Sequence, residues 1–243
     1  MGWSVVVGTV QVATTLAGVI KTVVGSPITV HYRRAGSAAT AMSPEDVPRE
    51  LVERARLLHV TGITAALSDT AFEAVMEAVR CARSAGVPVS LDPNLRLRLA
   101  PPERWRVLID ALARQSDVVL TGADEAEIFT AGADPVAWLR ERGVATVVIK
   151  HGAQGATEHD LRPGGQVTEQ RARAVALVDP VGAGDAFDAG WLSAWLRGLA
   201  AAERLREAVA VASLVVATRG DATGLPTAAL RDRVLAEGAD VER

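Results

Sequence analysis

Residues 177–191 read LVDPVGAGDAFDAGW, and this stretch decides the fold. The apolar run at residues 174–178 indicates a buried strand, which an Asp-Pro pair ends. Residues 181–184 then carry almost no side chains, as a tight turn requires. From Asp185 onward, apolar residues recur at helical spacing. The sequence therefore predicts a strand, a glycine-rich turn and a helix with a carboxylate in its first turn.

The glycine-rich turn has two alternative interpretations. The first amides of a helix have no acceptor within the helix, and the helix dipole adds partial positive charge there. Small residues would let an anion approach those amides, and Asp185 beside them could accept a proton from a hydroxyl group. Together these features suit phosphoryl transfer. Alternatively, Gly182 and Gly184 only make the turn, and Asp185 only caps the helix.

The composition restricts the class of protein. With 243 residues, 49% of them hydrophobic, the chain can bury a full core. Its net charge of -3 offers no polybasic surface, so we expect neither nucleic-acid binding nor membrane binding. A single cysteine, Cys81, excludes an internal disulfide bond and fits a reducing compartment. Because no apolar run reaches the length of a membrane span, we expect a cytoplasmic protein.

Strands and helices alternate along the chain. A hairpin-like pair of strands is predicted within residues 18–32. The later predicted strands are residues 57–60, 87–91, 117–120 and 145–150, and the predicted helices are residues 44–56, 69–85, 101–114, 123–130, 135–142, 185–196, 202–217 and 226–235. This alternation predicts an α/β fold, with a mostly parallel sheet and helices on both of its faces.

Polar residues gather where the predicted strands end. The segments concerned are residues 61–62, 92–96, 122–125, 150–155 and 182–185. The carboxyl ends of parallel strands lie along one edge of a sheet, and open α/β sheets bind their ligands there. We therefore expect the functional site at this edge.

Three of these segments resemble those of one family. DPVGAGDAF at residues 179–187, SLDPNLR at residues 90–96 and VVIKHGAQGA at residues 147–156 resemble segments of the ribokinase (PfkB) carbohydrate-kinase family, most closely its 2-keto-3-deoxygluconate kinase branch. The resemblance implies a ribokinase-like fold in a single domain, residues 1–243, with a partial β lid whose strands lie at about residues 14–36. It also implies an N-terminal truncation, because this sequence does not show the family's first strand and G-G-x-x-x-N segment.

The resemblance also implies roles for individual residues. The expected catalytic residues are the base Asp185 and an anion hole formed by Gly182, Ala183 and Gly184. The expected nucleotide-binding residues are Asn94, Lys150, Gly152, Gly155 and Gly184. Glu125 is expected to hold a metal ion through water, although Gly122 stands where the family has Asn. The expected cofactors are ATP and Mg²⁺.

A further group of residues suits a sugar substrate. Tyr32 and Arg34 are two positions apart, so they share one face of a predicted strand. A phenol and a guanidinium together suit a polyhydroxylated acid, and a solvated strand edge is the alternative. The resemblance implies that Arg96 reaches the sugar acid, and Asp221 is another substrate-binding candidate.

The resemblance implies ATP-dependent phosphorylation of a sugar or sugar-acid hydroxyl, in particular conversion of 2-keto-3-deoxygluconate to its 6-phosphate. The alternative is a catalytically impaired, truncated kinase remnant that acts as a nucleotide-binding or interaction module. Lid strands of this family often pair between subunits, so we also expect a homodimer. The small-molecule partners would be ATP and the sugar or sugar acid.

Overall fold

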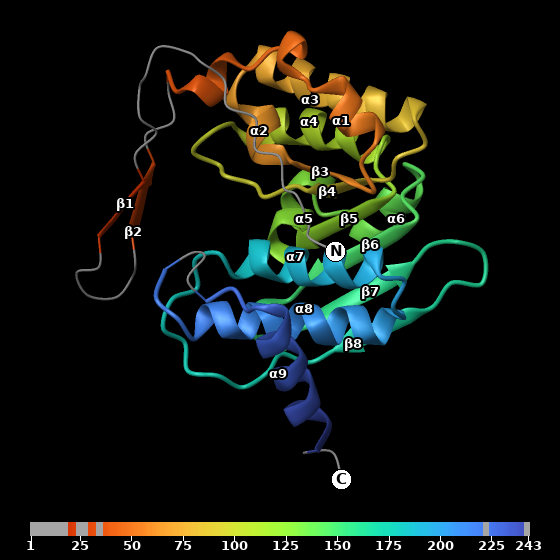
Figure 1. Ribbon diagram of the computed structural model, residues 1–243. Helices are drawn as coiled ribbons and strands as arrows, with labels where there is room; N and C mark the ends of the chain where they lie inside the picture. Colours follow the sequence, from red (N-terminus) through yellow and green to blue (C-terminus); the bar gives the residue numbers. More distant parts are fainter. Residues whose placement is uncertain (1–18, 23–28, 33–35, 221–223, 241–243) are drawn as a thin grey trace. The chain divides into compact units, whose positions relative to one another are not determined.

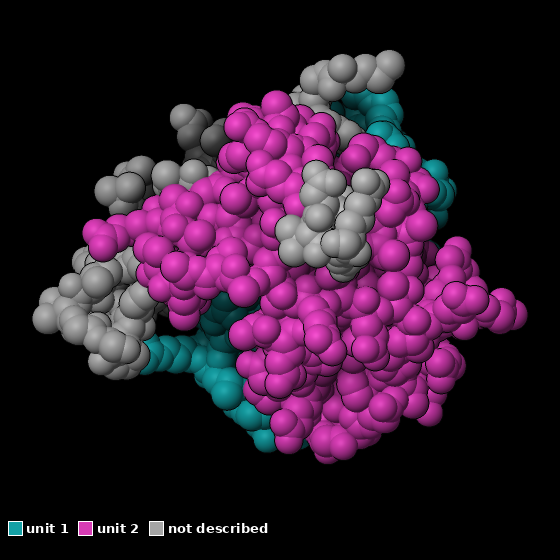
Figure 2. Space-filling model, turned by 90° about the horizontal axis from the view of Figure 1, so that it is seen from below, with its two compact units in different colours: residues 1–115 teal, residues 116–243 magenta. Residues whose placement is uncertain are grey.

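The computed structural model describes residues 19–22, 29–32, 36–220 and 224–240. The chain divides into two compact units, Met1–Gln115 and Ser116–Arg243, which Figure 2 shows in teal and magenta. Each unit has strands and helices of its own (Figure 1).

A two-stranded antiparallel sheet comes first in unit 1. Strand β1 (Val19–Thr22) pairs with β2 (Thr29–Tyr32), with Val19 opposite Tyr32. These two strands belong to a sheet of their own. The hairpin-like pair predicted within residues 18–32 is therefore confirmed.

The rest of unit 1 is an α/β arrangement. Strand β3 (Leu58–Thr61) pairs in parallel with β4 (Val89–Asp92), and a parallel pair requires a crossover connection. The helical elements are η1 (Ala38–Ala41), η2 (Pro44–Asp46), α1 (Arg49–Glu53), α2 (Gly62–Leu67), α3 (Asp69–Ser84) and α4 (Pro102–Ala113). Helices α2 and α3 form the crossover, as the alternation of strands and helices in the sequence predicts.

In unit 1, one prediction is wrong in detail and one helix was not predicted. Residues 44–56 form a 3-10 turn and a separate short helix instead of one helix. Pro48 divides them, because it has no amide hydrogen and disfavours a helical conformation at the preceding residue. Helix α2 is not predicted by the sequence. It begins directly at the end of β3, where the Thr61 side chain accepts the amide of Ile63.

Unit 2 is built on a mixed sheet. Strand β5 (Val118–Gly122) is parallel to β6 (Thr146–Lys150), β7 (Ala156–Asp160) is antiparallel to β6, and β8 (Val167–Gln170) is antiparallel to β7. The helical elements are α5 (Ala123–Thr130), α6 (Pro135–Arg140), η3 (Gly152–Gln154), α7 (Ala183–Leu196), α8 (Ala201–Val216) and α9 (Ala228–Asp240). The predicted helices of this unit are confirmed to within a few residues at their ends.

Strands β7 and β8 are not predicted by the sequence. Their residues read as a glycine-rich, polar stretch, and β8 alternates between exposed and half-buried positions. β7 has two buried positions, and the one in its middle is a carboxylate, Glu158, instead of an apolar residue. Neither strand therefore shows the apolar run by which a buried strand is recognised.

Helices cover both faces of the unit 2 sheet. Consecutive strand residues point to opposite faces. Glu158 of β7 bonds to side chains of α7 and α8. Burial lowers the pKa of its neighbour His159, on which Asp134 and Arg140 at the two ends of α6 also act. The predicted α/β fold, with parallel strands and helices on both sheet faces, is confirmed.

Residues 174–178 do not form the buried strand that their apolar run predicts. Leu177 and Val178 are 71% and 46% exposed. The amides of Val178 and Asp179 both donate to the carbonyl of Val216, at 2.8 and 3.1 Å. Val216 ends α8, where helix carbonyls lack amide donors within the helix. This segment is therefore held by the end of α8 instead of by a neighbouring strand.

A buried carboxylate joins a strand to two helices in unit 2. Helices α7 and α8 approach closely at Gly190, where a Cβ would stand 2.9 Å from Cα of Ala208. Next to it, Nε1 of the fully buried Trp191 donates to Oε2 of Glu158 at 2.8 Å. Arg204 of α8 donates its Nε to the same oxygen at 3.2 Å and forms an ion pair with Oε1.

We expect Arg204→Met to lower the free energy of unfolding by about 3 kcal/mol, because a buried carboxylate that loses its cation is left uncompensated. Glu158 is 1% exposed, so solvent cannot replace the arginine. Urea denaturation measures the effect. Arg114→Met, which breaks an exposed pair with Asp110 on α4, is the matched control and should cost less than about 1 kcal/mol. Equal losses in the two variants would contradict this assignment.

Candidate functional site

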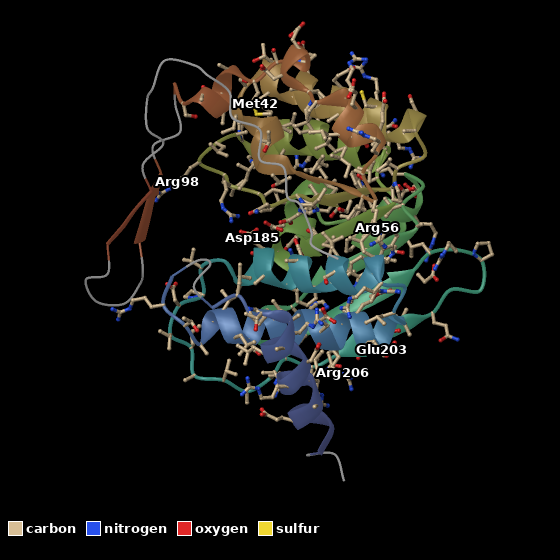
Figure 3. All side chains as sticks on the ribbon, viewed as in Figure 1. Met42, Arg56, Arg98, Asp185, Glu203 and Arg206 are labelled. Carbon is tan, nitrogen blue, oxygen red and sulfur yellow. The ribbon has the colours of Figure 1, made fainter. Side chains whose placement is uncertain are left out.

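Helix α7 begins after a glycine in the left-handed conformation. Gly182 has φ 82° and ψ -6°, which costs a residue with a side chain about 1–2 kcal/mol. Its carbonyl accepts the amide of Ala186 at 2.9 Å, and the amide of Ala183 donates to Pro180 at 3.3 Å. Asp185, which is labelled in Figure 3, follows in the first turn of α7. The predicted glycine turn and first-turn carboxylate are confirmed as local structure.

A buried carboxylate holds this turn in place. Asp179 is 2% exposed. Its Oδ1 accepts the amide of Val181 and its Oδ2 accepts the amide of Gly220, both at 3.1 Å. The carboxylate thus joins the turn before α7 to the segment after α8. Sequence reasoning assigned Asp179 only to the end of a strand, although an Asp two residues before a turn amide is typical of an Asx turn.

A cavity of about 580 Å³ opens beside the turn, within the usual size range of small-molecule sites. Five of the expected site residues line it: Lys150, Gly152, Gly155, Ala183 and Gly184. Most of the remaining wall is apolar and includes Phe187 of α7 and Val209, Ala212 and Val216 of α8. The cavity therefore combines a polar, glycine-rich side with an apolar side.

Lys150 and Asp188 form a buried ion pair at this cavity. Nζ of Lys150 lies 3.1 Å from both carboxylate oxygens of Asp188, and the two side chains are 15% and 4% exposed. A Cβ on Gly184 would stand 3.9 Å from Nζ, so the ammonium lies against the glycine turn. Sequence reasoning missed Asp188. Its position three residues after Asp185 on a helix was a signal that the two carboxylates share a side.

Glu125 has a structural role at the start of α5. Its Oε2 accepts the amide of Gly122 at 3.1 Å, as in a capping box. Within the described parts of the chain, no three or more His, Cys, Asp and Glu side chains are grouped so that they could hold a metal ion. Magnesium does not require such a group, because it keeps several waters and binds through one or two carboxylates and substrate phosphates. A single carboxylate such as that of Glu125 suits a hydrated ion that is held largely by phosphate.

The expected site residues of the SLDPNLR segment, residues 90–96, belong to unit 1. Asn94 has φ 43°, in the left-handed region that Asn tolerates, and its amide donates to Oδ1 of Asp92 at 3.2 Å. Nη1 of Arg96 donates to the carbonyl of the preceding residue at 2.8 Å. Gly62 leaves room for the segment, because a Cβ there would overlap the carbonyl oxygen of Pro93.

Three expected substrate-binding residues have no described side chain. Arg34 and Asp221 lie outside the described residues, and only the backbone of Tyr32, in β2, is described. Their roles stay predictions. In unit 2, by contrast, the structure brings the turn before α7 and the Lys150–Gly155 loop to one cavity.

Comparison with known proteins shows the family. The model of the pfkB family of carbohydrate kinases matches residues 5–228, so the chain belongs to this family. A 2-dehydro-3-deoxygluconokinase of Thermoproteus tenax is 37% identical over 199 residues, which are 81% of this chain and 60% of that relative. One of Bacillus subtilis (strain 168) is 34% identical over 207 residues, 84% of this chain and 63% of the relative. The chain thus spans less than two thirds of the length of these curated relatives.

Solved structures agree with the fold. The crystal structure of a PfkB protein from Polaromonas sp. JS666 is 35% identical with a TM-score of 0.74, covering 89% of this chain and 69% of that one. A putative ribokinase II from E. coli, in complex with ATP and Mg²⁺, is 23% identical with a TM-score of 0.82, covering 90% and 71%. The second likeness shows the fold alone. The predicted ribokinase-like fold is confirmed.

Alanine should have very different effects at two glycines of the cavity wall. At Gly155, φ is 110°, and a Cβ would overlap the carbonyl oxygen of Gln170 and stand 2.8 Å from the amide nitrogen of Ala172. At Gly152, φ is 57° and nothing lies within 4 Å of a Cβ. We expect Gly155→Ala to lower the free energy of unfolding by about 3 kcal/mol or more. The control Gly152→Ala should cost about 1–2 kcal/mol, the strain of its backbone conformation alone. Chemical denaturation would refute this reading if the two losses were equal.

Proposed function

We propose that this chain transfers the γ-phosphoryl group of ATP to a hydroxyl of a sugar or sugar acid. The observation that supports this most is a cavity in unit 2 that is lined by a glycine turn and a lysine, with a carboxylate in the first turn of the helix that follows. Phosphoryl transfer requires mainly positioning and electrostatic stabilisation, and these groups offer both. Membership of a carbohydrate-kinase family supports the same activity.

Asp185 is the proposed catalytic base. Its carboxylate accepts the proton of the substrate hydroxyl, whose oxygen forms a bond to the γ-phosphorus while the bond from that phosphorus to the bridging oxygen of ADP breaks. Gly182, Ala183 and Gly184 lie at the positive end of α7, where backbone amides stabilise negative charge on the transferring group. A Cβ at Gly184 would stand 3.9 Å from Nζ of Lys150, so a larger side chain there would crowd the ammonium.

The cavity is the proposed nucleotide site. Its apolar side, with Phe187, Val209 and Ala212, suits the adenine ring. Its polar side offers Lys150 as a positive charge, and Gly152 and Gly155 let phosphate oxygens approach the backbone. Asn94, in unit 1, is a further proposed nucleotide contact. The relative from E. coli that was crystallised with ATP and Mg²⁺ has the same fold.

Mg²⁺ is the proposed metal cofactor, and Glu125 would hold it through water. When bound, the ion would offset the negative charge of the phosphates. The carboxylate of Glu125 is already fixed by the amide of Gly122. It therefore presents a stable orientation to a hydrated ion.

The proposed substrate is 2-keto-3-deoxygluconate, phosphorylated at its 6-hydroxyl. Relatives named 2-dehydro-3-deoxygluconokinase support this choice. 2-Dehydro-3-deoxygluconate and 2-keto-3-deoxygluconate are two names for one compound. Tyr32, Arg34, Arg96 and Asp221 are the proposed substrate contacts. A guanidinium pairs a carboxylate through two hydrogen bonds, which would favour a sugar acid over a neutral sugar.

The activity is tested by ATP consumption with 2-keto-3-deoxygluconate. We expect turnover by the chain, and a loss of about 100-fold or more in Asp185→Asn, because amide oxygen is a far weaker base than carboxylate. Binding of ADP, measured by calorimetry, should change little in this variant.

The matched control is Asp69→Asn, which changes an exposed carboxylate in the first turn of α3. It should leave turnover unchanged. Turnover retained in Asp185→Asn would refute the role of the base. Nucleotide binding without turnover by the unaltered chain would favour the alternative, a kinase remnant that binds nucleotide.

A homodimer formed through the lid strands is also proposed. Strands β1 and β2 form a narrow sheet, and each strand of a two-stranded sheet has an unpaired edge that can accept another strand. Analytical ultracentrifugation should give twice the mass of 25.4 kDa. A single species at the monomer mass at working concentration would contradict it.

The proposed location is the cytoplasm. Cys81 is a buried free thiol, and burial raises its pKa, which keeps it protonated and unreactive. None of the helices in the described residues is both long and apolar enough to span a bilayer.

A further inference from the structure

The geometry points to Asp188 as a positioning residue that fixes Lys150 beside the anion-binding turn. This inference rests on the proposed function, because it concerns how the cavity receives the phosphates of a nucleotide. Asp188 itself does not line the cavity, whereas Lys150 does. Asp188 therefore acts on the ligand through the lysine.

The contact between the two side chains joins separate elements. Lys150 ends β6 and Asp188 lies in α7, 38 residues later. The ammonium nitrogen is 3.1 Å from each carboxylate oxygen, which places it symmetrically on the carboxylate. The lysine is thus tied to the same helix whose first turn forms the proposed anion hole.

Burial makes this tie hard to break. The Asp188 side chain is 4% exposed and that of Lys150 is 15% exposed. A buried carboxylate that loses its cation is strongly destabilised, so the ammonium cannot swing away from Asp188 at low cost. Lysine otherwise has a long, flexible side chain whose ordering opposes binding. Asp188 removes that flexibility before the ligand arrives, as preorganisation requires.

The ammonium of Lys150 lies close enough to the glycine turn to contact an anion bound there. A Cβ on Gly184 would stand 3.9 Å from Nζ, and both residues line the cavity. A phosphate that approaches the backbone of Gly184 therefore approaches the ammonium as well. Lys150 is one of two lysines in a chain with 26 basic residues. Lysine gives this position a compact ammonium with three donors instead of a planar guanidinium.

The two possible roles of Asp188, a simple negative charge or a positioning group, predict opposite changes in nucleotide affinity when its carboxylate is removed. If the carboxylate acted only as a negative charge near the site, its removal would favour an anion and tighten nucleotide binding. If it positions Lys150, its removal leaves the ammonium mobile and weakens binding. The direction of the change therefore separates the two roles.

The test is a double-mutant cycle with ADP as the probe, using the full chain and isothermal titration calorimetry at one salt concentration. We expect Asp188→Asn and Lys150→Met each to raise the dissociation constant of ADP by about tenfold. The double variant should bind no more weakly than Lys150→Met alone, because Asp188 acts only through the lysine. Thermal melting with and without ADP checks that each variant is folded.

Glu158→Gln is the matched control. It breaks another buried ion pair between a strand and a helix of unit 2, but neither Glu158 nor Arg204 lines the cavity. We expect it to lower the melting temperature and to leave the dissociation constant of ADP unchanged. Weaker binding in this control would mean that lost stability alone explains the effect of Asp188→Asn.

Three other results would overturn the inference. In the first, Asp188→Asn binds ADP at least as tightly as the unaltered chain. In the second, Asp188→Asn weakens ADP binding by the same factor whether residue 150 is Lys or Met. In both cases nucleotide binding by the unaltered chain still supports the proposed function. No ADP binding by the unaltered chain would instead overturn the proposed function, and this inference with it.

Discussion

The left-handed turn at Gly182 is the constraint on which the candidate site depends. Because φ there is 82°, the chain reverses immediately before α7, and the first residues of that helix, Ala183 and Gly184, line the cavity. Asp179 holds the turn by accepting two amides, one from Val181 in the turn and one from Gly220 in the segment after α8. The same start of α7 fixes where Asp185 and, one turn later, Asp188 stand. One backbone reversal therefore places the anion-binding amides, the candidate base and the partner of Lys150.

Unit 2 uses buried ion pairs for two different purposes. Glu158 and Asp188 are both almost fully buried, and each binds a cation from another element, Arg204 and Lys150. Such pairs add little net stability when formed, yet breaking one is costly. At Glu158 the pair sits beside Trp191 and connects β7, α7 and α8. At Asp188 the pair places a positive charge on the wall of a cavity.

The sequence predicted the parts of this molecule that depend on local pattern. Apolar runs identified β3 to β6, and helical periodicity with a first-turn carboxylate identified α7. Prediction from the sequence failed where contacts between distant segments determine the local structure. Residues 174–178 are apolar but are anchored to the end of α8, and β7 buries a carboxylate whose partners lie in distant helices. Asp188 was missed for the same reason, since its ion pair with Lys150 appears only when β6 and α7 come together.

The measurement that tests the central claim most directly is a crystal structure of the chain with a non-hydrolysable ATP analogue. We predict that the terminal phosphate lies at the backbone of residues 182–184, that the adenine occupies the apolar side of the cavity, and that Lys150 contacts a phosphate while it stays paired with Asp188. An analogue bound elsewhere, or one whose phosphates point away from the start of α7, would contradict the account.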